Sequence, residues 1–107
     1  HEMFLRDSEK MKLIIRGLFD TDGTIVFDKD PRYKKPYPII RITTIHEGLR
    51  DQIADALSKM GFRVTRHYKN IQLKGISQMH KWFSIINPQN EKHRLKYQNY
   101  IAKNMPE

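Results

Sequence analysis

The fold of this chain is decided by the stretch Ile14-Ile15-Arg16-Gly17-Leu18-Phe19-Asp20-Thr21-Asp22-Gly23-Thr24. Its apolar residues recur at helical spacings and predict a helix that runs to about Thr21, while the β-branched residues after Gly23 predict a strand. Asp20 and Asp22 then lie in the last turn, at the negative pole, where an acid typically costs about 0.3–1 kcal/mol. Such acids favour a positive group nearby, such as a metal ion or a Lys; alternatively, they are only polar turn formers before the terminating glycine.

The composition favours one basic domain without cysteine chemistry. At 107 residues the chain can bury a single core, so we expect one domain over residues 1–107. The absence of Cys excludes disulfide scaffolds and Cys-based zinc sites, and neither a membrane-spanning run nor a secretory signal is evident. Twenty basic against twelve acidic residues give a net charge of +8, which favours nucleic acid or an anionic surface as partner over mere solubility.

The rest of the chain alternates between strand and helix patterns. Period-two alternation predicts strands over residues 24–29, 39–44, 62–68 and 71–75, and a Pro-rich basic connection over residues 30–38 forms the tip of the first hairpin. Helical periods predict helices over residues 47–60, from residue 77 to the stop at Asn87-Pro88, and over residues 92–102. Helix N-caps are expected at Asp7-Ser8, at Thr44 in a capping box with Glu47, and at Ser77.

Each predicted strand has one apolar and one polar face. Trp82 lies inside an apolar helical stripe, so we expect it in the core rather than as a platform for a stacked base. A sheet with one buried face can be ordinarily solvated on the other, or can lie on DNA, where Arg pairs with guanine, Gln with adenine, and Lys or Thr with phosphate. We favour DNA, and the residues expected to bind it are Asp28, Arg41, Thr43, Arg63, Thr65, His67, Gln72 and Lys74.

The nine residues Ile15 to Gly23 resemble the signature of the LAGLIDADG homing endonucleases. Both acids, both glycines and the central Leu match, while Arg16 and Thr21 replace the usual Ala. A second region, Asn87-Pro88 followed by residues 92–97, is similar to a later landmark of the family once residues 89–91 are treated as an insertion. The resemblance implies an α+β fold of order αββαββα, in which helices cover one side of a four-stranded antiparallel sheet and DNA contacts the other.

The resemblance also implies a Mg²⁺-dependent, site-specific DNA endonuclease. Asp22 matches the acid that binds the divalent cation, Mg²⁺ or another such as Mn²⁺, and the backbone carbonyl of Thr21 would be a further ligand. Lys96 matches a Lys near the scissile phosphate, so Asp22 and Lys96 are the expected catalytic residues. A chain with one signature motif would act as a homodimer on a long, near-palindromic site. The expected dimer interface consists of Gly17, Leu18, Asp20 and Thr21.

Other functions remain open from the sequence. The chain could be a non-cleaving module of the same fold, either an intron RNA maturase or a DNA-binding regulator, which makes intron RNA a further candidate partner. It could also be one half of a two-motif enzyme or an endonuclease segment of an intein. A third alternative is a basic α+β adaptor that binds only protein. A protein of this family would be intracellular, in the cytoplasm, the nucleoid or an organelle, with no membrane partner.

Overall fold

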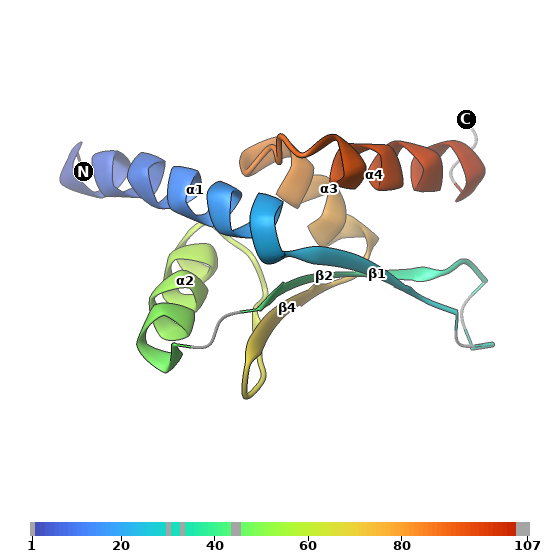
Figure 1. Ribbon diagram of the computed structural model, residues 1–107, viewed down its shortest axis with the longest axis horizontal. Coiled ribbons are helices and arrows are strands. Elements are labelled where there is room, and N and C mark those ends of the chain that lie inside the picture. Colours follow the sequence, from blue (N-terminus) through green and yellow to red (C-terminus); the bar gives the residue numbers. More distant parts are fainter. Residues whose placement is uncertain (1, 30, 33, 44–45, 105–107) are drawn as a thin grey trace.

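The computed structural model of the chain describes residues 2–29, 31–32, 34–43 and 46–104, with side chains from residue 9 onward (Figure 1). It is an α+β fold with four helices and a four-stranded antiparallel sheet, in the predicted order. The elements are α1 (Glu2–Asp22), β1 (Thr24–Asp28), β2 (Tyr37–Thr43), α2 (Glu47–Lys59), β3 (Thr65–Arg66), β4 (Asn70–Lys74), α3 (Ile76–Ile85) and α4 (Glu91–Asn104).

The sheet has the strand order β1-β2-β4-β3, so β1 forms one edge and the short β3 the other. Its register aligns four polar residues across the strands: Thr24 pairs with Arg41, Arg41 with Gln72, and Gln72 with Thr65. Because side chains alternate between faces along a strand, these four residues share one face of the sheet. Arg41, Thr65 and Gln72 thus share one polar face, as the alternation predicted, and Thr24 extends this polar row.

The opposite face of the sheet carries the core. Figure 1 shows α1, α3 and α4 on the same side of the sheet, with α2 beside its end under the first half of α1. Strands β2 and β4 contribute fully buried aliphatic side chains to this side, and Trp82 of α3 is also fully buried. The Trp82 ring packs edge-on against Phe19 of α1 at 5.1 Å between centroids. The expected core position of Trp82 is confirmed.

The third strand is much shorter than predicted, and side chains from other elements explain why. Gln78 of α3 accepts a hydrogen bond from the backbone N–H of Arg63 at 2.7 Å and donates to its carbonyl at 2.8 Å. Arg50 of α2 donates to the carbonyls of His67 and Tyr68 at 3.2 and 3.1 Å. The backbone groups on both sides of Thr65–Arg66 are thus occupied, and pairing with β4 is limited to two residues.

The helices also begin differently from the prediction. Helix α1 already starts at Glu2, so Asp7-Ser8 does not cap it. Thr44 lies outside the described residues, and α2 follows His46, which makes no side-chain cap bond. Helix α3 starts after Gly75 rather than at Ser77, because Gly75 turns the chain out of β4 with a φ of 109° that other residues rarely adopt. Within the described residues, no helix is long and apolar enough to span a bilayer.

Candidate functional site

Asp20 binds the N-terminal end of α4. Its two carboxylate oxygens accept hydrogen bonds from the backbone N–H groups of Gln89 and Asn90, at 3.0 and 3.1 Å. Asn90 returns a bond from its side-chain amide to the Asp20 carbonyl at 2.8 Å, and its side-chain oxygen caps α4 by accepting from the Lys92 N–H at 2.9 Å. The N-terminal end of α4 thus supplies the positive partial charge that an acid at the end of α1 favours.

Arg16 holds the neighbouring helix end. It lies one turn before Asp20 on α1, and its Nε donates to the carbonyl of Ile86 at 2.8 Å, at the C-terminal end of α3. A cation at the negative end of one helix and an anion at the positive end of the next are both favourable. We call Arg16 and Asp20 the α1 clamp, because together they fix both ends of the 86–90 connection. Sequence reasoning missed the role of Arg16, although its spacing of four residues from Asp20 places the two side chains on one helix face.

His93 of α4 packs behind the end of α1. Its side chain is 5% exposed, the centroid of its ring lies 4.4 Å from that of Phe19, and the described residues leave its buried Nδ1 without a hydrogen-bond partner. Burial lowers the pKa of His93, with smaller lowering contributions from Lys96 and Lys92, while the Phe19 backbone and the charge of Asp20 act in the opposite direction. The neutral imidazole is therefore the form that the fold accommodates.

Asp22 differs from Asp20 in being unengaged. It is exposed at the last residue of α1, and the described residues offer its carboxylate neither a hydrogen bond nor an ion pair. Thr21 is also exposed; its hydroxyl donates to the Gly17 carbonyl at 2.8 Å, and its own carbonyl lies in the last turn, where helical N–H partners are missing. A free carboxylate beside a free carbonyl presents the hard oxygen ligands that suit Mg²⁺.

One chain supplies only part of a metal site. In the described part of the chain, no three His, Cys, Asp or Glu side chains gather closely enough to hold a metal ion. Magnesium usually keeps several waters and takes one or two carboxylates, with substrate phosphates completing its shell. The donor set at Asp22 and Thr21 therefore fits a metal that is also coordinated by water, by nucleic-acid phosphate or by a second copy of the chain.

Lys96 lies at the same end of the sheet as Asp22. Its Nζ is 3.4 Å from the carbonyl oxygen of Ile25 in β1, three residues after Asp22. No contact between Lys96 and Asp22 themselves is present among the described interactions. The structure thus brings the two expected catalytic residues to neighbouring positions without joining them directly.

The expected DNA-binding residues lie on or beside the polar face. Arg41 is half-buried there, and the described residues leave its buried Nε without a hydrogen-bond partner. Arg63 and His67 were expected within the third strand, but they flank β3 and are exposed. The remaining members occupy strand positions of the polar face: Asp28 in β1, Thr43 in β2, Thr65 in β3, and Gln72 and Lys74 in β4.

One face of α1 is exposed although it is apolar. Leu13 and Ile14 are 61% and 50% exposed, and a Cβ on Gly17 would have no neighbour within 4 Å. The expected interface residues divide around this face, because Thr21 is exposed beside Gly17, whereas Leu18 packs partly against the core. Asp20 is engaged within its own chain, and its place in a dimer interface remains a prediction. Sequence reasoning did not assign Leu13 and Ile14 to this surface.

Together these features define a basic α+β domain with an open polar sheet face, a free acid at the end of its first helix and an exposed apolar helix face. The family described as LAGLIDADG-like domain matches residues 9–101. The chain therefore belongs to the LAGLIDADG family, which comprises homing endonucleases and maturases. A search among curated proteins found no match to the chain.

Replacing Asp20 with Ala should destabilise the fold, because the N–H groups of Gln89 and Asn90 lose a charged acceptor. We expect the free energy of unfolding to fall by about 1–3 kcal/mol, measured by urea denaturation. Asp22→Ala is the matched control, since Asp22 is an acid of the same helix turn without a described partner, and should stay within about 0.5 kcal/mol. Equal effects of the two substitutions would contradict the clamp.

His93 should make the stability depend on pH. The unfolded chain binds a proton at the ordinary pKa of 6.5, whereas the folded chain resists it. Unfolding therefore takes up a proton as the pH falls below that value, and the free energy of unfolding decreases. Urea titrations between about pH 7.5 and pH 5.5 should show a smaller decrease for His93→Gln than for the natural sequence. Parallel curves for the two proteins would show that His93 does not contribute.

Proposed function

We propose that this chain is a divalent-metal-dependent, site-specific DNA endonuclease that acts as a homodimer. The observation that carries the proposal is the contrast between the two acids of the signature motif. Both carboxylate oxygens of Asp20 accept hydrogen bonds from the start of α4. Asp22, two residues later, is exposed beside the Thr21 carbonyl and has no described hydrogen bond or ion pair. A carboxylate that contributes no described contact to the fold is available for chemistry.

The polar sheet face supports DNA as the substrate. Arg41 and Gln72 are neighbours in the cross-strand row, and these two side-chain types pair bidentately with guanine and adenine. The connections at the two ends of the sheet are basic: Lys34 and Lys35 are exposed in the β1–β2 connection, and Lys69 in the β3–β4 turn. Figure 1 shows the β1–β2 hairpin at the right and the β3–β4 turn pointing downward near the middle, well separated from each other. Such an arrangement suits a long duplex that crosses the face between them.

Phosphodiester hydrolysis assigns separate tasks to the residues near Asp22. A bound Mg²⁺ would neutralise phosphate charge and lower the pKa of a bound water. The Asp22 carboxylate and the Thr21 carbonyl would hold that ion at the end of α1, whose position is fixed by the α1 clamp. Lys96 would offer its ammonium to the negative charge that develops on the phosphate. Lys96 is half-buried and held at Ile25, so its side chain is partly ordered before DNA binds.

The exposed face of α1 supports a homodimer. A second copy that covers Leu13 and Ile14 would remove their apolar surface from water. Gly17, with no neighbour of its own, would let two α1 helices approach closely. Such a pairing would bring two copies of Asp22 near one axis, as cutting both strands of a near-palindrome requires. The dimer would also double the net charge of +8, so affinity for DNA should fall steeply with salt.

Asp22→Asn should abolish cleavage and leave binding intact, because the amide keeps the shape of the side chain but loses the charge that holds a cation. The natural protein, incubated with a randomised duplex library and Mg²⁺, should yield a long near-palindromic cut site. The variant should yield none while binding the recovered site with unchanged affinity. Chelation with EDTA should reproduce the effect of the variant.

Failure of the natural protein to cut would favour the non-cleaving function. In that case both proteins should retain a specific duplex or a structured intron RNA, and the free Asp22 would have no catalytic role. Cleavage that survives in Asp22→Asn would contradict the assignment of this acid while preserving the endonuclease.

Gly17→Leu should dissociate the dimer without unfolding the chain. The new side chain has open space in the single chain but would separate two closely packed α1 helices. We expect the apparent dimer dissociation constant, measured by analytical ultracentrifugation, to rise at least about tenfold, a change of about 1.4 kcal/mol. Gly48→Leu is the matched control, because Gly48 of α2 also has no neighbour within 4 Å of an added Cβ. A monomeric natural protein, or equal effects of both variants, would contradict the interface.

A further inference from the structure

A basic hollow of about 250 Å³ lies between α4 and the β1–β2 hairpin, on the helix side of the sheet. Three lysines line it: Lys29 after the end of β1, and Lys96 and Lys103 from α4. Among the residues that the structure describes, no Asp or Glu lines the hollow. We call it the α4 pocket, and neither the expected DNA-binding face nor the proposed metal site includes it.

The floor of the α4 pocket is formed by two stacked aromatic rings and a hydrogen bond. Phe27 and Tyr100 stack with 5.0 Å between ring centroids and an interplanar angle of 11°. The Tyr100 hydroxyl donates a hydrogen bond to the carbonyl of Pro36 at 2.7 Å, which ties α4 to the base of the hairpin. The ammonium groups around this floor are thus presented from backbones that are fixed relative to one another.

The described lining of the pocket has positively charged hydrogen-bond donors but no carboxylate to neutralise them. Lys29 and Lys103 are exposed, and Lys96 uses one donor on the Ile25 carbonyl at a long distance of 3.4 Å. An ammonium group carries three donors, so Lys96 has two more to offer. Asn99 adds a side-chain amide to the wall. This combination of ammonium and amide groups over a small hollow suits a phosphate group.

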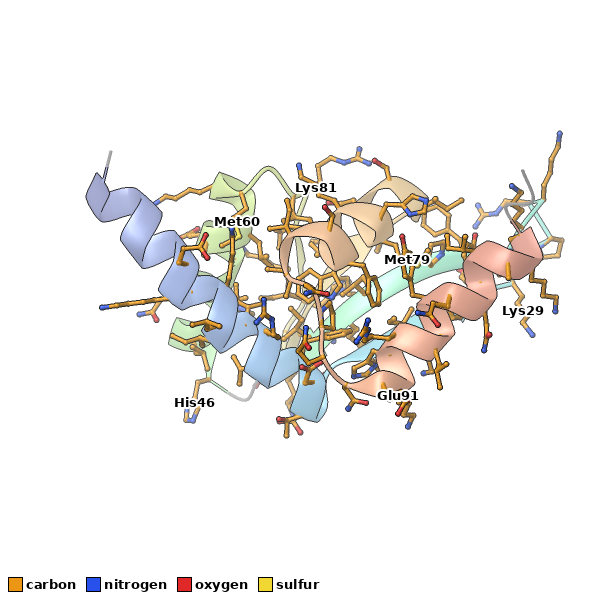
Figure 2. The ribbon with its side chains drawn as sticks, turned by 90° about the horizontal axis from the view of Figure 1, so that it is seen from above. Lys29, His46, Met60, Met79, Lys81 and Glu91 are labelled. Atoms are coloured by element: carbon orange, nitrogen blue, oxygen red, sulfur yellow. The ribbon has the colours of Figure 1, made fainter. Side chains whose placement is uncertain are left out.

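The pocket shares Lys96 with the proposed cleavage site and extends away from it. Lys96 lies at Ile25, three residues after Asp22, and Lys103 follows two turns later on α4, about 10 Å further along the helix. Figure 2 shows α4 running from Glu91 along the sheet to the neighbourhood of Lys29. The lysines therefore form a line that leads away from Asp22 along β1, the edge strand of the sheet.

We propose that the α4 pocket binds a backbone phosphate of the DNA strand, further along that strand than the phosphate that is cut. The proposal rests on the proposed function, because the line of lysines begins at Lys96 beside Asp22. DNA is favoured over RNA since β1 lines the pocket through Phe27, while the other face of the same strand contributes to the polar row expected to contact the duplex. Lysines beside the edge strand β1 would contact the phosphate backbone of the cut DNA strand, while the polar face of the sheet contacts the bases.

Lys103→Gln tests the pocket, with Lys59→Gln as its matched control. Both are exposed lysines in the last turn of a helix, and both substitutions change the net charge equally. The probe is a 30-base-pair duplex of random sequence, titrated by fluorescence anisotropy over a range of NaCl concentrations without divalent metal. Lys103→Gln should reduce the slope of log K against log[NaCl] by about 0.9 per subunit, the value of one lost phosphate contact. Lys29→Gln should do the same, and Lys59→Gln should leave the slope unchanged.

The outcomes test the α4 pocket and the proposed endonuclease activity independently of each other. If Lys103→Gln has the same slope as Lys59→Gln, the α4 pocket is overturned, whether or not the natural protein cleaves DNA. A lowered slope in a protein that never cuts supports the pocket and overturns only the endonuclease. If Lys103→Gln weakens binding to a stem-loop RNA but not to the duplex, the assignment to DNA is wrong.

Discussion

The α1 clamp, formed by Arg16 and Asp20, is the interaction on which the candidate site depends. Through it, one turn of α1 receives the negative end of α3 and the positive end of α4. Helix α4 in turn carries His93 against Phe19 and Lys96 against Ile25. The end of α1 and the start of β1 are thus enclosed by groups that the clamp positions, and only Asp22 is left without a described contact.

Much of the fold follows from local patterns. The alternation in β1, β2 and β4 predicts both the strands and the shared polar face of Arg41 and Gln72, because a period of two sends alternate side chains to opposite faces. The helical stripe around Trp82 likewise predicts its burial. In these elements the same residues that determine the local conformation also face the core, so a short window of sequence contains the information.

The parts that could not be predicted depend on contacts between distant residues. The side-chain amide of Gln78 binds the backbone of Arg63 in place of a neighbouring strand. No residue within 62–68 indicates this contact, because its partner lies in α3. Asp20 finds its partner 70 residues later, at Asn90. Asn90 lies in the three residues that interrupt the resemblance to the family. An Asn directly before Glu91 is a typical helix N-cap, so the sequence did contain a sign of its role at the start of α4. The apparent insertion thus supplies the backbone groups and the side chain that bind Asp20 of the signature motif.

The bond from Lys96 to Ile25 has a consequence for β-sheet edges. Strand β1 ends the sheet on one side, and an edge strand exposes backbone groups onto which another chain can add. The Lys96 ammonium occupies one such carbonyl and places a charge beside the strand. The lysine to which we assign the scissile phosphate therefore also disfavours edge-to-edge association with another chain. Replacing Lys96 would therefore expose the Ile25 carbonyl as an acceptor for another chain, so a loss of solubility is expected beside any effect on the proposed function.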